Sequence, residues 1–207
     1  MEGGGGMDAQ SARQRAAEGF AAAARQDESP PRWCWRLLGR ACAQEALAAA
    51  HGRGGCELTA ETARALEEIR RRCRVPTGRL AYTGSPAPLP AGVSGQAVQA
   101  AVIALIAAGL RRGGQAAAVG IRLFRDGNAA VLLVVSSGST AGDRLGQRLG
   151  RALARTAGGS FLTAAGGGQV SAALRLPLTD CAPCPPFDPT GQYGTAAGLL
   201  WEFGVWD

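Results

Sequence analysis

The sequence contains no lysine, and it has one histidine, His51, and one asparagine, Asn128. Any mechanism that needs two histidines is therefore excluded. Aromatic residues make up 5% and charged residues 18% of the 207 residues. Nucleic-acid-binding surfaces usually gather basic groups on one face and interleave aromatic side chains among them. We therefore expect no nucleic acid partner.

Long apolar runs are also missing. The longest, Ala100 to Leu110, has 11 residues, whereas a bilayer-spanning helix needs about 20. The first 30 residues include Arg13, Arg15 and Arg25, where a signal peptide would need an apolar stretch. We therefore expect a cytoplasmic protein with no membrane span.

The charge that is present is spread along the chain. All 22 basic residues are arginine and the net charge is +6, with 13 arginines against 10 acidic residues in 1–79 and 9 against 6 in the rest. The one dense cluster, Arg70 to Arg74, fits a solvated helix end. Rich in alanine and glycine and free of lysine, the composition is typical of a GC-rich, bacterial genome.

Four segments follow from the pattern of the chain. Residues 1–29 are expected to form a flexible lead, within which 12–25 could be a short alanine-rich helix. Residues 30–76 predict a helical hairpin, with one helix from Pro31 to Gly52 and a second from Thr59 to Pro76. Its apolar stripes are narrow, so the hairpin needs a partner surface, and a homodimer through 30–75 is one way to supply it.

The third segment, 77–178, predicts an α+β fold. Residues 84–92 hold three prolines and are expected to be a linker or loop. After it, the periodicity gives the order helix, strand, strand, helix, strand, strand, which favours a two-layer sandwich with helices on one face of a sheet; the expected elements are 94–112, 118–124, 129–135, 143–157, 160–165 and 169–176. The first helix is apolar nearly all round, which indicates burial between the sheet and something else.

The fourth segment, 179–207, is a proline-rich and aromatic tail. Its end, from Leu199 to Trp206, is expected to pack onto the sheet or the hairpin as an extra strand, with a docking strand for a partner as the alternative. Cys181 and Cys184 form a C-x-x-C pair, but a zinc site needs four ligands and no second such pair exists. We therefore expect surface thiols in a reducing compartment and no metal.

The element order and the residues at its joints resemble the ATP-binding domain of sensor histidine kinases, the GHKL or Bergerat family. The resemblance runs from Leu80 to Leu178. The residues that carry it are Val134 to Gly138 at the adenine motif, Arg144 to Gln147 at the glycine-rich helix start, Gly158 and Gly159 at the helix end, and Leu174 to Pro177 in the closing strand. It implies a helical hairpin followed by a two-layer sandwich of the histidine-kinase ATPase type.

The same resemblance implies that the nucleotide site is degenerate. The family's Asn-box falls on Ala104 to Arg111, so Ala108 stands where the magnesium-binding asparagine belongs. Ser136 replaces the aspartate that reads adenine. Gly138 and Gly146 retain glycines of the site, but the seven residues between them are too few for the family's mobile lid. We therefore expect that ATP and Mg²⁺ binding is lost.

His51 is the one candidate phospho-acceptor. A helical hairpin ahead of a kinase-like domain is where such a histidine would lie, and Arg53 could help to hold a phosphoryl group. A histidine at a helix end is also explained as a simple cap that interacts with the helix dipole. Both interpretations stay open here.

The preferred function is a signalling pseudokinase in a two-component-like pathway. It would act by protein contacts or phosphotransfer, with a response-regulator-like receiver as a partner. The alternatives are a divergent but active sensor kinase and a structural assembly module with no relay role.

Overall fold

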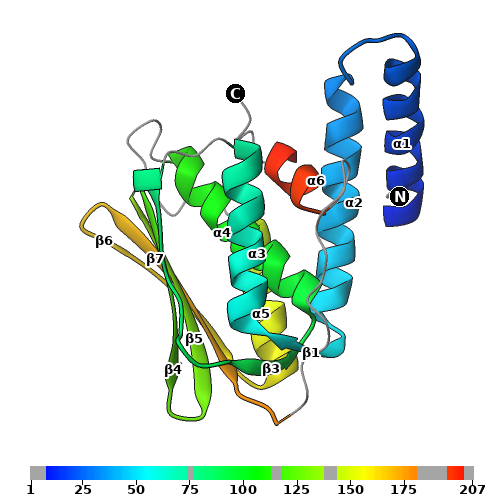
Figure 1. Cartoon of the computed structure of the whole chain (residues 1–207). Coiled ribbons are helices and arrows are strands. Elements are labelled where there is room, and N and C mark those ends of the chain that lie inside the picture. The colour runs from blue at the N-terminus through cyan, green and yellow to red at the C-terminus, as the bar shows by residue number, and fades with distance from the viewer. Residues whose placement is uncertain (1–7, 74–76, 113–117, 138–143, 181–194, 203–207) are drawn as a thin grey trace, which may run out of the picture.

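The computed structural model describes residues 8–73, 77–112, 118–137, 144–180 and 195–202. The helices in these ranges are α1 (Ala9–Arg25), α2 (Arg32–Ala50), α3 (Leu58–Cys73), α4 (Gly95–Arg112), α5 (Arg144–Ala157) and α6 (Thr195–Glu202), with a short 3₁₀ turn at Thr77–Arg79. The strands are β1 (Arg53–Glu57), β2 (Leu80–Thr83), β3 (Pro90–Val93), β4 (Val119–Asp126), β5 (Ala129–Ser137), β6 (Ser160–Gly166) and β7 (Gln169–Pro177). Figure 1 shows the helices gathered on one face of the large sheet.

The large sheet has five strands in the order β2-β4-β5-β7-β6. β2 runs parallel to β4, and every other neighbouring pair is antiparallel. The two predicted hairpins, β4–β5 and β6–β7, are confirmed. Gly127 has a φ of 60° in the first of their turns, a conformation that glycine adopts at no steric cost. The α+β class is therefore confirmed, and the sheet is mixed.

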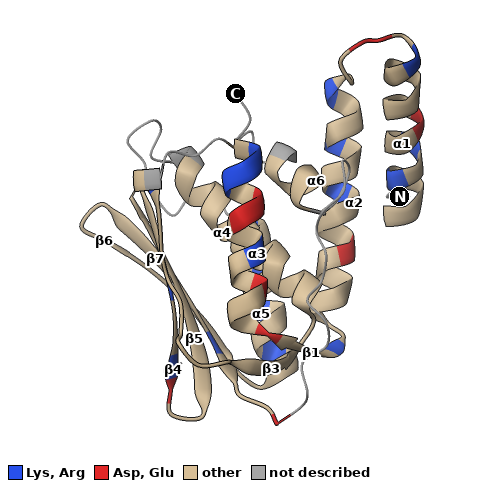
Figure 2. Ribbon diagram, in the orientation of Figure 1, with Lys and Arg blue, Asp and Glu red and all other residues tan. Residues whose placement is uncertain are grey.

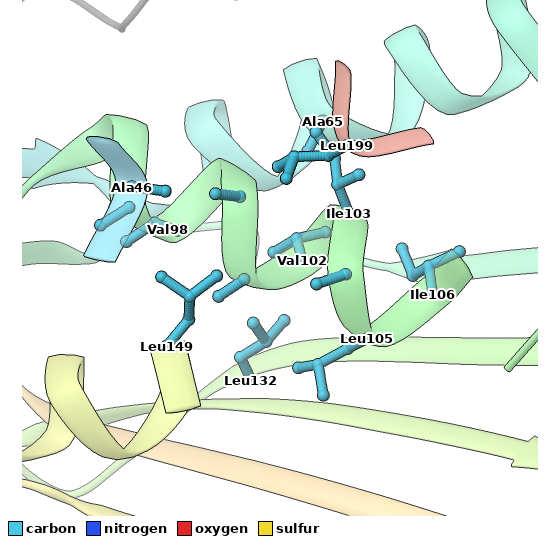
Figure 3. Packing of buried hydrophobic residues seen from close by; sticks show 14 of the residues in the cluster. Ala46, Ala65, Val98, Val102, Ile103, Leu105, Ile106, Leu132, Leu149 and Leu199 are labelled. Carbon is cyan, nitrogen blue, oxygen red and sulfur yellow. The ribbon is translucent and has the colours of Figure 1, made fainter. Parts of the chain in front are cut away.

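Helix α4 lies at the centre of the molecule, as its all-round apolar sequence predicts. Leu105 faces Leu132 of β5 on the sheet side, while Ile103 lies near Ala65 of α3 and Leu199 of α6 on the other side (Figure 3). Because both sides of the helix are covered, no polar stripe is needed. One continuous core therefore runs from the sheet through α4 to the outer helices.

Helix α5 ends as predicted. Gly158 has a φ of 71°, and the Gly159 N–H donates to the Ala154 carbonyl oxygen at 2.7 Å. This left-handed cap satisfies carbonyl groups at the helix end. Leu149 and Leu153 are fully buried, and four exposed arginines lie on the opposite face.

The amino-terminal region differs in part from the prediction. The short alanine-rich helix considered for 12–25 is present as α1, but it packs along α2 rather than belonging to a flexible lead. Arg13 makes an ion pair with Glu45 at 2.6 Å, and the Phe20 and Trp35 rings meet edge to face at 4.7 Å. Alanine and glycine on α1 let the two helices approach closely, a contact that a hydrophobicity pattern underestimates.

The pairing of helices differs accordingly. The hairpin partner of α2 is α1, whereas α3 packs against α4. The glycine-rich link between α2 and α3 contains β1, and the proline-rich 84–92 segment ends in β3, which pairs with β1 in a small antiparallel sheet. These short strands were missed because glycine and proline dominate them. The predicted segment limits at 29, 76 and 178 stay predictions.

The part of the predicted 199–206 segment that the structure describes, 199–202, packs back as expected, but in a helix rather than a strand; residues 203–206 lie outside the described ranges. α6 lies against α2 and α4, with Leu199 and Leu200 fully buried. Cys181 and Cys184 lie outside the described residues. Within the described ranges, no helix has both the length and the apolar character to cross a bilayer.

Candidate functional site

Two of the four predicted nucleotide-site residues, Ala108 and Ser136, lie on α4 and at the end of β5, which pack together. Gly109 of α4 faces the Ser136 side chain of β5 so closely that a Cβ at position 109 would lie 2.7 Å from the Ser136 Cβ and 2.9 Å from Val119 Cγ2. Real Cβ atoms are not found at such distances. The helix backbone therefore rests directly on the side chain of Ser136.

Ala108 and Ala104 are fully buried on the same helix. Their methyl groups are part of the packing between α4 and its neighbours, and neither offers an oxygen or nitrogen atom. Ser136 is 5% exposed and supplies one hydroxyl. The helix and the strand that form this site therefore contribute one neutral polar side chain at these three positions.

Ser137, the last residue of β5, completes the strand ladder. Its hydroxyl accepts a hydrogen bond from the Ala118 N–H at 3.4 Å, and its own N–H donates to the Ala118 carbonyl oxygen at 3.4 Å. Gly138 lies outside the described residues. Gly146, the other predicted glycine, is buried on α5, which packs against α4.

A magnesium nucleotide needs hard oxygen ligands and a hydrogen-bond acceptor for the adenine amino group. Ala104 and Ala108 supply no such atom, and the Ser136 side chain occupies the space against Gly109. Within the described part of the chain, no three histidine, cysteine, aspartate or glutamate residues are grouped so that they could hold a metal ion. At positions 104, 108 and 136 the chain therefore supplies one neutral hydroxyl and no carboxylate or amide oxygen.

Solved structures resemble this chain in fold over 61% to 83% of its length. The chain superposes on the Acinetobacter baumannii histidine kinase AdeS with a TM-score of 0.53 and 11% identity, over 83% of this chain and 97% of that one. The catalytic domain of histidine kinase ThkA gives 0.52 and 13% identity, over 61% and 98%. The ATP binding domain of PrrB from Mycobacterium tuberculosis gives 0.50 and 17%, over 62% and 99%.

The chain has the fold of a histidine kinase ATP-binding domain. The resemblance that we inferred from the order of the elements and from the motif residues between them is therefore confirmed as to fold. At these identities the likeness extends to the fold alone. No family model matches the sequence, and no curated protein does.

Within this kinase-type fold, His51 lies away from the nucleotide-site positions. It is exposed and follows α2, where its N–H donates to the Ala48 carbonyl oxygen at 3.2 Å and the Gly52 N–H donates to that of Ala49 at 3.1 Å. Thr156 of α5 donates to the neighbouring Ala50 carbonyl at 2.8 Å. Gly146 lies ten residues earlier on α5, about 15 Å along the helix axis. The structure therefore places His51 and Gly146 at opposite ends of α5.

A shallow cavity of about 270 Å³ lies elsewhere on the kinase-type sheet. It is formed where the loop after β2 meets the second half of β4, and its lining residues are 83–87 and 122–125. Ser136 pairs with Val119, at the other end of β4. The cavity is therefore separate from the nucleotide-site positions.

Two features of the site region were missed by sequence reasoning. Our sequence analysis placed Gly109 inside the Asn-box and drew no conclusion from the glycine itself. A glycine inside a helix costs about 1 kcal/mol relative to alanine, and a helix that carries this cost often does so because a neighbouring element packs closely against it. Glu61 of α3 and Gln99 of α4 form a buried hydrogen bond, and both side chains are 1% exposed. Glu61 follows the same helical spacing as the buried Ala65 and Glu68, a pattern that could have indicated its burial.

Proposed function

We propose that this chain is a signalling protein with a kinase-type domain that has lost nucleotide binding and acts through contacts with other proteins. The observation that carries the proposal is the direct contact of Gly109 with Ser136, together with alanine at positions 104 and 108. A charged acceptor contributes about 1.5–3 kcal/mol per hydrogen bond, and a neutral one about 1. A site reduced to one neutral hydroxyl offers little to hold a nucleotide.

The fold supports a place in two-component signalling, because the solved structures that it resembles are histidine kinases. In such a pathway the partner would be a response-regulator-like receiver. A homodimer through residues 30–75, which our sequence analysis considered, stays a prediction. The chain would then transmit a signal by binding or by phosphotransfer, without consuming ATP.

Equilibrium dialysis of the full chain against labelled ATP with Mg²⁺ tests the proposal. We expect no saturable binding up to millimolar nucleotide. An unrelated active histidine kinase serves as the positive control. Micromolar binding that is abolished by Ser136→Lys, but unaffected by Thr83→Lys at the far edge of the sheet, would overturn the proposal.

A divergent active kinase is the second candidate, and His51 carries it because it is exposed and is the one histidine of the chain. Incubation with γ-labelled ATP, followed by acid and base treatment, distinguishes the two. Acid-labile label that disappears in His51→Ala would favour the active kinase. Absence of label, with transfer from a phosphorylated receiver to His51, would instead favour a phosphotransfer protein; absence of both would favour an assembly module.

A further inference from the structure

Strand β6 leaves one side of its backbone unpaired. It stands at the end of the sheet, and all seven of its residues pair with β7 in one uninterrupted antiparallel register. In the described part of the chain, no strand pairs with its outer side. The edge therefore offers a regular row of N–H and C=O groups to another extended chain.

This edge lacks the features that usually prevent strands from pairing. Proteins place charges, prolines or bulges on edge strands, but β6 reads Ser-Phe-Leu-Thr-Ala-Ala-Gly and contains none of these. Leu162 is 68% exposed, and Figure 2 shows no charged residue on the strand. The opposite edge, β2, has four residues and runs into the proline-rich loop, so it is too short to serve the same purpose.

The Phe161 side chain of β6 packs against helix α5. Gly150 of α5 lies over the Phe161 ring so closely that a Cβ at position 150 would overlap it. This contact and the uninterrupted pairing with β7 order the strand within a single chain. A preordered edge loses less conformational entropy when another strand binds it.

On the face of the sheet opposite the helices, the positions next to Leu162 and Ala164 carry small or apolar side chains. Leu162 is in register with Ala173, which is in register with Leu133, and one row further Ala164 follows Ser171 and Val135. The helices lie on the other face (Figure 1). The same face also carries Arg175, in register with Ser160, and Arg122, in register with Leu133. A strand added to β6 would therefore continue a surface that is uncharged next to Leu162 and Ala164.

A second copy of β6 matches this edge. If two copies pair antiparallel about a two-fold axis at Thr163, Ser160 lies opposite Gly166 of the other copy and Leu162 opposite Ala164, so no like charges meet. Such an isologous contact closes after two subunits. Pairing of β6 with β2 of another copy would be head to tail and would leave three residues of β6 unmatched. The two-fold arrangement uses the whole edge.

We propose that the chain forms a homodimer by antiparallel pairing of β6 with β6 of a second copy, which joins the two five-stranded sheets into one. The contact is formed by backbone hydrogen bonds along 160–166 and by the apolar side chains of Leu162 and Ala164. This surface is distinct from the α1–α2 hairpin, and it does not depend on whether the nucleotide site functions.

Sedimentation velocity over a range of protein concentrations tests the dimer. We expect a concentration-dependent dimer for the natural chain. In the double variant Leu162→Lys/Ala164→Lys, four lysines would face one another at the junction, and we expect the dissociation constant to rise at least about tenfold. Both side chains point to the exposed face, so the fold should be kept, and circular dichroism confirms this.

The control is Thr83→Lys, which adds a charge to the same face at the opposite edge and should leave the dimer unchanged. A chain that is monomeric at all concentrations would overturn the proposal. So would a dimer that survives the double variant, since it would then form through another surface such as the hairpin.

Disulfide trapping tests the register. In Thr163→Cys the new thiols of two copies would lie opposite each other, and mild oxidation should give a covalent dimer. Thr83→Cys and the natural chain, treated alike, control for the native cysteines. Cross-linking no greater than in these controls would refute pairing centred on Thr163.

Discussion

Single residues set the distance between α4 and the sheet. Gly109 brings the helix backbone onto Ser136 and Val119. The same principle operates where Gly150 covers Phe161 and where Gly198 of α6 faces Leu38 and Cys42. In each case atoms of a neighbouring residue occupy the space that a side chain at the glycine position would take, so the interior is close-packed.

We predict that Gly109→Ala destabilises the protein by about 1–3 kcal/mol. Alanine normally favours a helix over glycine by about 1 kcal/mol, so a net loss would show that the overlap with Ser136 outweighs propensity. Urea unfolding followed by circular dichroism measures the effect.

The matched control for this change is Gly120→Ala in β4, where a new Cβ would meet no atom within 4 Å. We expect it to be neutral or slightly stabilising. Adding Ser136→Gly to Gly109→Ala should restore part of the loss. An unchanged or increased stability of Gly109→Ala alone would show that α4 can shift away from the strand at little cost.

At the scale of elements, Glu57 joins a helix to a loop. Its carboxylate accepts hydrogen bonds from the N–H groups of Thr59 at 3.0 Å and Ala60 at 2.6 Å, which caps α3, and from the Leu89 N–H at 2.8 Å. Burial acts to raise the pKa of Glu57, but these three hydrogen bonds outweigh it and the pKa is lowered. The carboxylate therefore fixes the start of α3 against the segment that becomes β3.

We predict that Glu57→Gln costs about 1 kcal/mol at neutral pH, the usual size of a capping interaction. Because the pKa of Glu57 is lower in the folded state, its contribution is complete above the unfolded pKa and is lost as the pH falls through the folded value. The natural chain should therefore lose stability on acidification below about pH 5, and the variant should lose less.

Unfolding free energies between about pH 7 and pH 3 measure this difference. Both proteins should keep part of the dependence of unfolding free energy on pH, because the pKa of Glu68 is also lowered. Burial acts to raise this pKa, but hydrogen bonds from Arg71 and Arg72 outweigh burial. Glu67→Gln, on the exposed face of the same helix, is the control for the removal of a negative charge from α3. Equal slopes in the natural chain and Glu57→Gln would contradict the role given to Glu57.

At the scale of the whole molecule, α6 connects the hairpin to the sheet domain. It packs on α2 and on α4, and Thr156 of α5 adds a hydrogen bond to the end of α2. The amino-terminal hairpin and the carboxyl-terminal helix therefore share one core with the kinase-type fold. We expect a single unfolding transition.

Leu199→Ala is predicted to destabilise this unit by about 2–5 kcal/mol, because the side chain is fully buried between the helices. Far-ultraviolet circular dichroism and tryptophan fluorescence, to which Trp33 and Trp35 of α2 contribute, should shift together. Leu47→Ala, at a half-buried position of α2, should cost less. Separate transitions for the two signals would show that the hairpin unfolds independently.

Much of the sheet domain could be predicted because its signals are local. The two hairpins follow from alternating apolar residues on either side of glycine turns, and the end of α5 follows from Gly158 and Gly159. The position of α4 between two layers follows from its lack of a polar stripe. At the candidate site, the spacing of the elements was enough to align Ala108 and Ser136 with the family's magnesium-binding and adenine-reading positions.

The tertiary structure decided which surfaces meet. α1 packs on α2 through alanine, glycine and one phenylalanine, and such small residues give little hydrophobic signal along the chain. The contact of Gly109 with Ser136 joins residues that are distant in sequence, as does the hydrogen bond of Glu61 with Gln99. Periodicity tells which side of an element is buried. The partner that buries it depends on shape and on contacts across the fold, and these exist only once the chain has folded.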